Sequence, residues 1–393
     1  MSSQDTLQAR LGRLQRGFLS CGVLALLLCL LFGSRNPWQG YHSYLFAYVF
    51  WMAIPLGCLA VLMVHHMTGG WWGLPIRRLL EAGTRTMLLM TLLFVPILVG
   101  LSRIYPWTNP AYLVNDRVGH FKWAYLHPGP FTVRAVIYFA ILLSLVFTLN
   151  KWSREQDRTG DPALADRMNV LSGPGLVLWS LIVTGAAFDW VMSLEPRWFS
   201  TIYGMVFIVV ECLVALSFVL FLLRMLSDYE PLKDCVKPKD YVDLGNLVLT
   251  FVMLWAYLSF SQFLIIWSGN LKDEIPWYRT RAFGGWAAVA VVLIVLHFFV
   301  PFFLLLQRGL KRKLRTLSWI AAFMVALTLV DIYWLVVPAY EKAGPRIHPL
   351  DILAVVGIGG LWVGAYFWEL KKLPLLPVHD PRFEGVLEHE HGD

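Results

Sequence analysis

The fold is decided by residues 176–226, which read LVLWSLIVTGAAFDWVMSLEPRWFSTIYGMVFIVVECLVALSFVLFLLRML. Two long apolar segments flank a short turn from Ser193 to Ser200, and each segment carries one acid, Asp189 or Glu211. A charged carboxylate near the bilayer centre costs about 2.5–3.5 kcal/mol on insertion scales, so it normally faces the protein interior, where it pairs or holds a proton. The stretch therefore predicts a helical hairpin inside a membrane, with both acids turned inward.

The rest of the chain has the same apolar character. Of its 393 residues, 58% are hydrophobic and 15% are charged, which is too apolar for a soluble domain. A helix of roughly 17–25 apolar residues crosses a hydrocarbon core of about 30 Å. We therefore predict an all-α integral membrane protein with ten transmembrane helices near residues 15–32, 44–66, 82–104, 131–150, 172–194, 201–226, 245–269, 283–306, 316–338 and 350–369.

The distribution of positive charge indicates how the protein is oriented in the membrane rather than a nucleic-acid partner. The formal charge is +7, but the basic residues are scattered through short loops and form no basic face. With a cytoplasmic N-terminus, 22 of the 33 Lys and Arg fall in inside segments and the other 11 outside. This bias predicts that both termini are cytoplasmic. No small-x-small cleavage site follows Leu31, so we interpret the first apolar run as a spanning helix.

The cysteines carry no motif for a covalently attached redox group. All five stand outside any C-x-x-C or C-x-x-C-H pattern, so neither an iron-sulfur cluster nor a c-type haem is predicted by motif, and no metal site is predicted. Small buried hydrophobes are the simpler interpretation.

The polar residues inside the predicted spans are few, and they occur at different depths. Groups that exchange protons at several depths are typical of part of a proton path. For Glu211, an interhelical hydrogen bond is the alternative role. The candidate proton path consists of Asp189, Glu211, Gln262, His297 and Asp331.

Asp189 has its nearest charged neighbours in the turn that follows it. Glu195 and Arg197 lie close enough in sequence to pair with Asp189, either as a structural ion pair or as part of a ligand pocket.

Prolines interrupt three spans at Pro55, Pro96 and Pro301, and each removes a backbone donor. Pro301 frees the carbonyl of His297, so a kink and a titratable ring are expected at one level.

Two long motifs resemble a known family. The first runs from Phe188 to Gly204 and the second, FSQFLIIWSGNLKDEIPWY, from Phe260 to Tyr278. Supporting stretches are KWAYL from Lys122, FTVRAVIYF from Phe131 and PVHDPR from Pro377. Together they resemble the ActF-type membrane subunits of alternative complex III, which belong to the NrfD and PsrC type of membrane protein.

That resemblance implies a single polytopic domain with two four-helix bundles, formed by helices two to five and six to nine, and with helices one and ten at the periphery. In this chain the implied limits are an N-terminal segment with helix one at 1–43, the bundles at 44–200 and 201–338, helix ten at 339–372 and a cytoplasmic tail at 373–393.

The resemblance also implies a place in a bacterial electron-transport complex in the cytoplasmic membrane. The family complex oxidises a quinol, usually menaquinol, and its iron-sulfur and c-haem subunits pass the electrons on. Partners would be those subunits, the paralogous ActC subunit, other small membrane subunits and the lipid bilayer. The quinol site of the family belongs to ActC. In this chain Asp189, Glu195 and Arg197 are therefore candidates for a group that resembles a quinol pocket, and no catalytic residue is predicted. Redox chemistry is expected on partner subunits.

Two other functional classes remain open at this stage. A stand-alone secondary transporter agrees with the intramembrane acids and prolines, although Pro55 and Pro96 find a counterpart only in Pro301 of the second half. A di-haem cytochrome b needs His pairs on facing helices, and the candidates His65, His66 and His297 are expected at different depths.

Overall fold

The computed structural model describes residues 3–109, 124–230, 232–377 and 380, apart from the side chains of residues 3–5 and 234. Within these residues it is helical without strands, and ten helical segments are long and apolar enough to cross a bilayer. The predicted all-α membrane fold is therefore confirmed. The first two spans are α1 (Ser3–Gly33) and α2 (Pro37–Thr68), and the last is α19 (Pro349–Leu370).

The intermediate spans include several that are divided into shorter pieces. They are α3 (Leu74–Arg85) with α4 (Met87–Leu93), α5 (Val95–Val99) and α6 (Leu101–Ile104); α9 (Pro128–Thr159); α10 (Ala163–Ala186) with η3 (Ala187–Val191) and η4 (Met192–Leu194); α11 (Tyr203–Leu226); α13 (Pro238–Gly269); α15 (Gly285–Val292) with η5 (Leu293–Phe299) and α16 (Val300–Leu306); and α18 (Leu314–Val336) with η6 (Val337–Ala339). Short connecting helices are η1 (Trp71–Gly73), η2 (Pro106–Thr108), α12 (Leu232–Cys235), α14 (Ile275–Ala282) and α17 (Arg308–Lys311).

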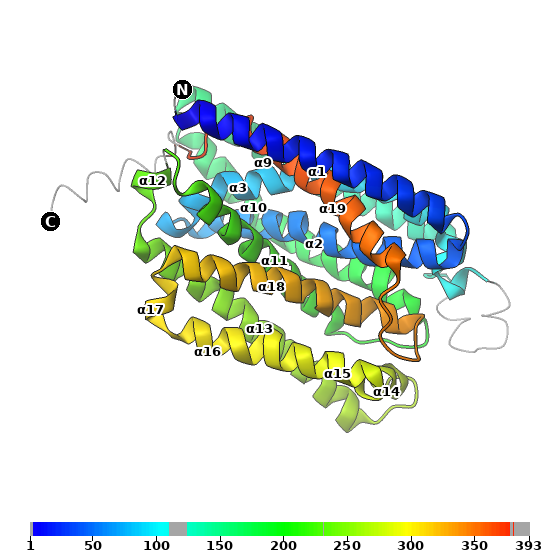
Figure 1. Ribbon diagram of the computed structural model, residues 1–393. Coiled ribbons are helices and arrows are strands. Elements are labelled where there is room, and N and C mark those ends of the chain that lie inside the picture. The colour runs from blue at the N-terminus through cyan, green and yellow to red at the C-terminus, as the bar shows by residue number, and fades with distance from the viewer. Residues whose placement is uncertain (1–2, 110–123, 231, 378–379, 381–393) are drawn as a thin grey trace.

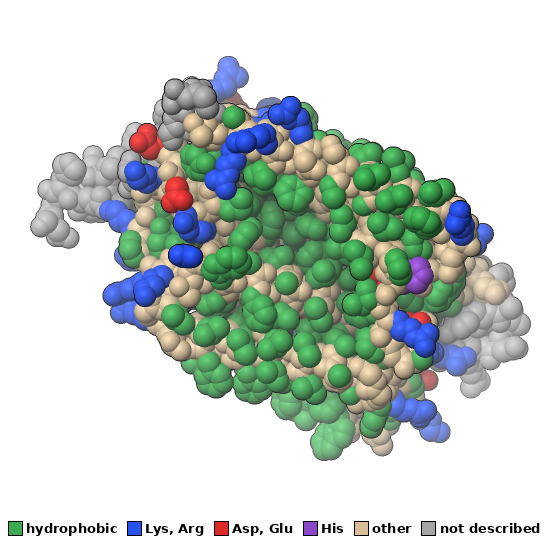
Figure 2. Space-filling view, viewed as in Figure 1, with side chains coloured by type: hydrophobic (Ala, Val, Ile, Leu, Met, Phe, Trp, Pro, Cys, Tyr) green, Lys and Arg blue, Asp and Glu red, His purple; other side chains and the backbone are tan. Residues whose placement is uncertain are grey.

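The spans lie side by side and run back and forth between the two ends of the molecule (Figure 1). We call the end where α1 begins and α19 ends the terminal end, and the other the opposite end. Helices α2, α3, α9 and α10 pack together, as do α11, α13, η5 and α18, and α2 also packs against α11. Helix α1 packs mainly on α19, outside both groups. In Figure 2, hydrophobic side chains cover the middle of the visible face and charged side chains gather toward the two ends, as expected for a protein embedded in lipid.

Two late spans begin with the same arrangement of proline and aspartate. Helices α13 and α19 each have Pro at their first position, where no backbone donor is needed. Asp240 and Asp351, two residues further on, each accept a hydrogen bond of 2.8 Å from the backbone N–H just before the helix. These reciprocal contacts set the helix starts.

The third span is broken where Pro96 removes a backbone donor. Helix α4 ends at Leu93 and α5 begins at Val95. Two tyrosines of α2 donate to carbonyls near this break, Tyr44 to Leu93 at 2.7 Å and Tyr48 to Met90 at 3.0 Å. Because lipid offers no hydrogen bonds, carbonyls near such a break need partners from neighbouring helices. Pro55, in contrast, lies within the continuous helix α2.

The third span also begins earlier than predicted, at Leu74 instead of near residue 82. Its first turns carry Arg77, Arg78 and Glu81, which look like loop charges in the sequence but are buried. The prediction was wrong here because these charges pair with one another and with neighbouring helices, as described below.

Helices α2 and α11 approach closely at Gly57. A Cβ atom at this position would lie 1.9 Å from the backbone carbonyl oxygen of Glu211. A backbone atom cannot move aside as a flexible side chain does, so only glycine fits. The contact joins the two four-helix groups at a point where both helices are deeply buried.

We expect Gly57→Ala to destabilise the protein by about 1–3 kcal/mol, because the added methyl group forces these helices apart. The measurement is thermal unfolding of the purified protein in detergent. Gly17→Ala in α1 is the control, since nothing lies within 4 Å of a Cβ atom there. Equal melting temperatures of the two variants would contradict the expectation.

Candidate functional site

Asp189 lies in η3, a π-helical turn at the opposite end of the first helix group, and it is only 1% exposed. The guanidinium of Arg134 on α9 donates two parallel hydrogen bonds of 2.9 Å to its two carboxylate oxygens. The Tyr138 hydroxyl, one turn further along α9, donates to the same carboxylate at 3.1 Å. Both oxygens of Asp189 are therefore already hydrogen-bonded within the chain.

The backbone around this group is shaped to admit these partners. Gly185 leaves room for Tyr138, since a Cβ atom there would lie 2.4 Å from the tyrosine hydroxyl. The carbonyl of Trp190 accepts a hydrogen bond of 3.0 Å from Tyr105. Single π-helical turns are frequent at functional sites because they re-aim a side chain. Here the turn directs Asp189 toward α9.

Tyr125 covers the outer side of Arg134. The guanidinium carbon lies 3.7 Å from the centroid of the phenol ring, a cation–π contact. Burial, together with the nearby Asp189 carboxylate, raises the pKa of Tyr125 to about 12, so the phenol stays neutral and can donate a hydrogen bond. Lys122 and Trp123, from the stretch just before it, lie outside the described residues.

Among the described residues, the predicted pairing of Asp189 with Glu195 or Arg197 of the turn is not found. Glu195 pairs instead with Arg281 of α14 at 3.1 Å, and Arg197 is exposed. Arg281 also donates to the carbonyls of Trp334 and Leu335 and stacks on Trp277. Burial lowers the pKa of Arg281, whereas the Glu195 carboxylate acts in the opposite direction. This pair ties the turn to the second helix group.

Glu211 lies apart from these ion pairs. Its side chain is buried on α11, and among the described residues its Oε2 atom has no hydrogen-bond partner. A void of about 10 Å³ beside it is also lined by Ala187 and Trp190 of η3. This volume is close to the minimum for one water molecule. Glu211 thus faces the turn that carries Asp189 without a direct hydrogen bond to it.

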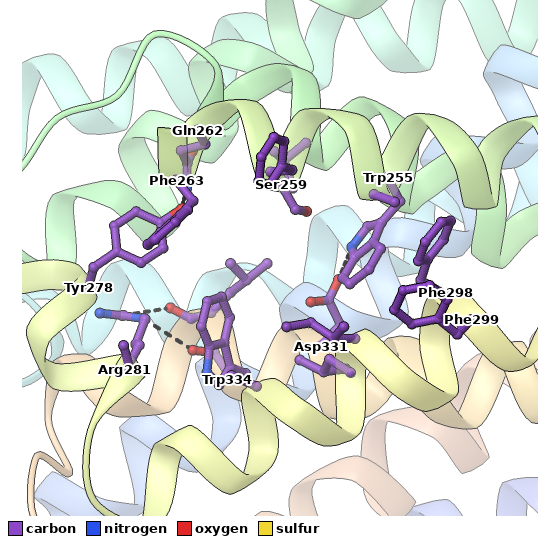
Figure 3. A pocket seen from close by; sticks show the side chains of 18 residues that line it. Trp255, Ser259, Gln262, Phe263, Tyr278, Arg281, Phe298, Phe299, Asp331 and Trp334 are labelled. Carbon is purple, nitrogen blue, oxygen red and sulfur yellow. Dashed lines mark hydrogen bonds between the residues drawn. The ribbon is translucent and has the colours of Figure 1, made fainter. Parts of the chain in front are cut away.

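Gln262 and Asp331 line one cavity in the second helix group (Figure 3). The cavity has a volume of about 510 Å³ and lies between α13, α14, η5 and α18. Asp331 on α18 accepts a hydrogen bond of 2.9 Å from Trp255 Nε1 on α13. Gln262 accepts from Ser200 at 3.0 Å and donates to the Tyr278 hydroxyl at 3.3 Å.

His297 does not line the cavity but lies behind Trp255, which does. Its ring makes an edge-on contact with Trp255, with centroids 4.4 Å apart, so the indole stands between His297 and Asp331. It lies in the π-helical turn η5, just before Pro301 in α16. The π-helical turn places an irregular stretch of helix at the level of His297, and the kink expected there stays a prediction.

A further polar cluster lies at the terminal end and escaped the sequence prediction. Glu81 accepts from Arg77 at 3.0 Å, Arg78 at 2.7 Å and Ser153 at 2.6 Å. Arg78 also pairs with Asp157, and Arg77 pairs with Asp380 of the C-terminal tail. The spacing of Arg77, Arg78 and Glu81 by three and four residues is the signal that could have revealed these pairs.

The cluster fixes part of the tail that the sequence assigned to residues 373–393. Leu375, Leu376 and Asp380 are buried, whereas residues 378–379 and 381–393 lie outside the described residues. The two histidines at the same end, His65 and His66 of α2, are buried as well.

No family model matches the chain, and no curated protein matches its sequence. The candidate residues are therefore interpreted from their geometry. They divide into three places: Asp189 with Arg134 and Tyr138, Glu211 beside η3, and the cavity lined by Gln262 and Asp331, with His297 behind Trp255.

Proposed function

We propose that this chain is an integral membrane subunit of a quinol-oxidising electron-transport complex of the alternative complex III type, in a bacterial cytoplasmic membrane with both termini in the cytoplasm. One observation carries the proposal most. Asp189 comes from one stretch of the family-like sequence, Arg134 and Tyr138 come from another, and the fold brings them together in one cluster around the buried carboxylate. If the two motifs resembled the family only by chance, there would be no reason to expect their residues to contact each other in the fold.

In this role the chain acts chiefly as a scaffold. Asp189 is held by a guanidinium through two parallel hydrogen bonds and by a phenol, and paired hydrogen bonds of this kind are among the stronger ones in proteins. It is a poor base for a quinol hydroxyl, because a quinol would first have to displace these partners. The geometry supports a structural role for Asp189. We propose that menaquinol is oxidised on partner subunits that carry iron-sulfur and c-haem groups.

Glu211 and Asp331 are the better candidates for proton transfer. Both are buried carboxyl groups without a salt bridge among the described residues. A proton path through them requires intervening water, since no side-chain hydrogen bond within the described residues joins the Asp189 cluster, Glu211 and the cavity.

Purification of the chain from its native membranes in mild detergent tests the proposal. We expect c-haem and iron-sulfur subunits and an ActC-like paralogue in the mass spectrum, a haem redox spectrum, and quinol oxidation by the preparation. Isolation of a lone, colourless chain that transports a solute in vesicles would contradict the proposal in favour of a secondary transporter.

The proton-transfer role makes a separate prediction. In the intact complex, we expect Glu211→Gln and Asp331→Asn each to lower proton translocation by about tenfold or more, because an amide holds no exchangeable acid proton at these positions. Translocation is measured as acidification of the medium by reconstituted vesicles during quinol oxidation. Asp273→Asn, in an exposed turn, is the matched control. Unchanged translocation in both carboxyl variants would end this assignment.

A further inference from the structure

The cavity of the second helix group opens sideways between two spans. Four of its lining residues are also exposed on the outer surface of the helices: Phe260 by 60% and Phe263 by 40% on α13, and Ile294 by 51% and Phe299 by 45% on η5. A side chain that both lines a cavity and faces outward stands at its rim. Because this rim lies on membrane-spanning helices, a molecule dissolved in the bilayer can reach the cavity directly.

The walls are apolar and aromatic, but polar groups converge at one side. The indole of Trp255 and the rings of Phe298 and Trp334 lie around the cavity in Figure 3. Asp331, only 2% exposed, turns one carboxylate oxygen to Trp255 and the other toward the cavity. The Ser259 hydroxyl also points inward and has no hydrogen-bond partner among the described residues. Apolar walls with a few placed polar groups are typical of small-molecule sites.

The ionisable groups around the cavity limit the charge of the head group that a bound molecule can carry. A buried ionic head group is costly at this depth, and Asp331 offers no counter-charge to a carboxylate or phosphate. Arg281, a cation that lines the cavity, is already held by Glu195 and by backbone carbonyls, so it does not offset this cost. A neutral hydroxyl, in contrast, can donate to Asp331 and accept from Ser259. The volume of about 510 Å³ lies within the usual range for small-molecule pockets.

We infer that the cavity between α13, α14, η5 and α18 binds an uncharged, hydroxyl-headed amphiphile that enters from the bilayer between α13 and η5. The hydroxyl head donates a hydrogen bond to Asp331 beside Ser259. The apolar body lies against the aromatic side chains of the cavity and extends through the rim into the bilayer. Lipid alcohols and alkyl phenols share this chemistry. The site is formed by this chain alone and goes beyond the proposed function, because it is independent of assembly with redox subunits.

Photolabelling of the full chain in phosphatidylcholine nanodiscs tests the site. The probes are octadecanol, octadecanoate and octadecylamine, each with a diazirine in its chain. We expect octadecanol to give saturable adducts on α13, η5 and α18, and the two charged probes to compete at least about tenfold more weakly, since their heads are ionic. Competition by unlabelled octadecanol and by an alkyl phenol then shows whether an aliphatic or an aromatic hydroxyl binds better.

Variants separate specific binding from general contact with lipid. Asp331→Asn is expected to weaken octadecanol binding about tenfold through loss of the carboxyl acceptor that faces the cavity, while its amide oxygen still accepts from Trp255. Ala256→Trp should abolish the saturable adducts by filling the cavity, and Ser259→Leu is the second cavity-filling variant if that one does not fold. Val177→Trp, on an exposed face of α10, is the control. Adducts that do not saturate, that persist in a folded cavity-filled variant, or that favour a charged probe would overturn the inference.

Discussion

Glu81→Gln is expected to cause the largest loss of stability of any conservative substitution in this chain. Glu81 lies between three guanidinium groups, with Arg77 at 3.0 Å, Arg78 at 2.7 Å and Arg85 at 3.5 Å. Both Arg77 and Arg78 are fully enclosed by α3, α9 and the tail. Removal of one partner from a buried ion pair costs about 3–5 kcal/mol, because the remaining charge is left without compensation. The variant should melt far below the wild type or fail to accumulate.

Glu369→Gln provides the matched control for this experiment. Glu369 contacts Arg85 at 4.0 Å, near the limit of an ion pair, and pairs at 2.6 Å with Lys372, whose side chain is exposed. Because exposed ion pairs contribute little, its loss should cost no more than about 1 kcal/mol. The double variant Glu81→Gln, Arg78→Gln removes a cation together with the acid and should recover part of the stability. Equal melting temperatures of Glu81→Gln and Glu369→Gln would contradict the role of Glu81.

The ten spans could be predicted from the sequence because each is a local pattern. Length and hydropathy define an apolar helix without knowledge of its neighbours. The third span shows the limit of this reasoning. Its start was placed too late because Arg77, Arg78 and Glu81 lower the local hydropathy, and only their contacts with Ser153 and Asp380 explain why they are buried.

The candidate acids were found from sequence, but their partners were not. Asp189 pairs with a residue 55 positions away, and Glu195 with one 86 positions away, so neither contact follows from local spacing. An isolated arginine at position 134 looks like a topology signal at the start of a span. Its role becomes visible only when α9 and η3 lie side by side. The grouping of Gln262, His297 and Asp331 likewise depends on the packing of three separate helices.

Asp189→Asn separates a structural from a chemical role for the Asp189 cluster. The variant loses the charge that holds Arg134 while it keeps the shape of the side chain. We expect a loss of about 2–3 kcal/mol, less than for Glu81, because Arg134 is 19% exposed and can turn toward water. The measurement is thermal unfolding of the purified chain. Arg134→Gln should cost a similar amount, and the double variant less than the sum of the two.

Turnover of the assembled complex then distinguishes the two roles. If Asp189 only joins η3 to α9, quinol oxidation per assembled complex should stay within about threefold of the wild type, with KM unchanged, since the carboxylate does not take part in the reaction. A carboxylate that receives a quinol proton would instead lower kcat by about 100-fold or more on removal. That second outcome, in a variant that still assembles, would move the reaction from a partner subunit to this chain, with Arg134 and Tyr138 as the groups that position the acid.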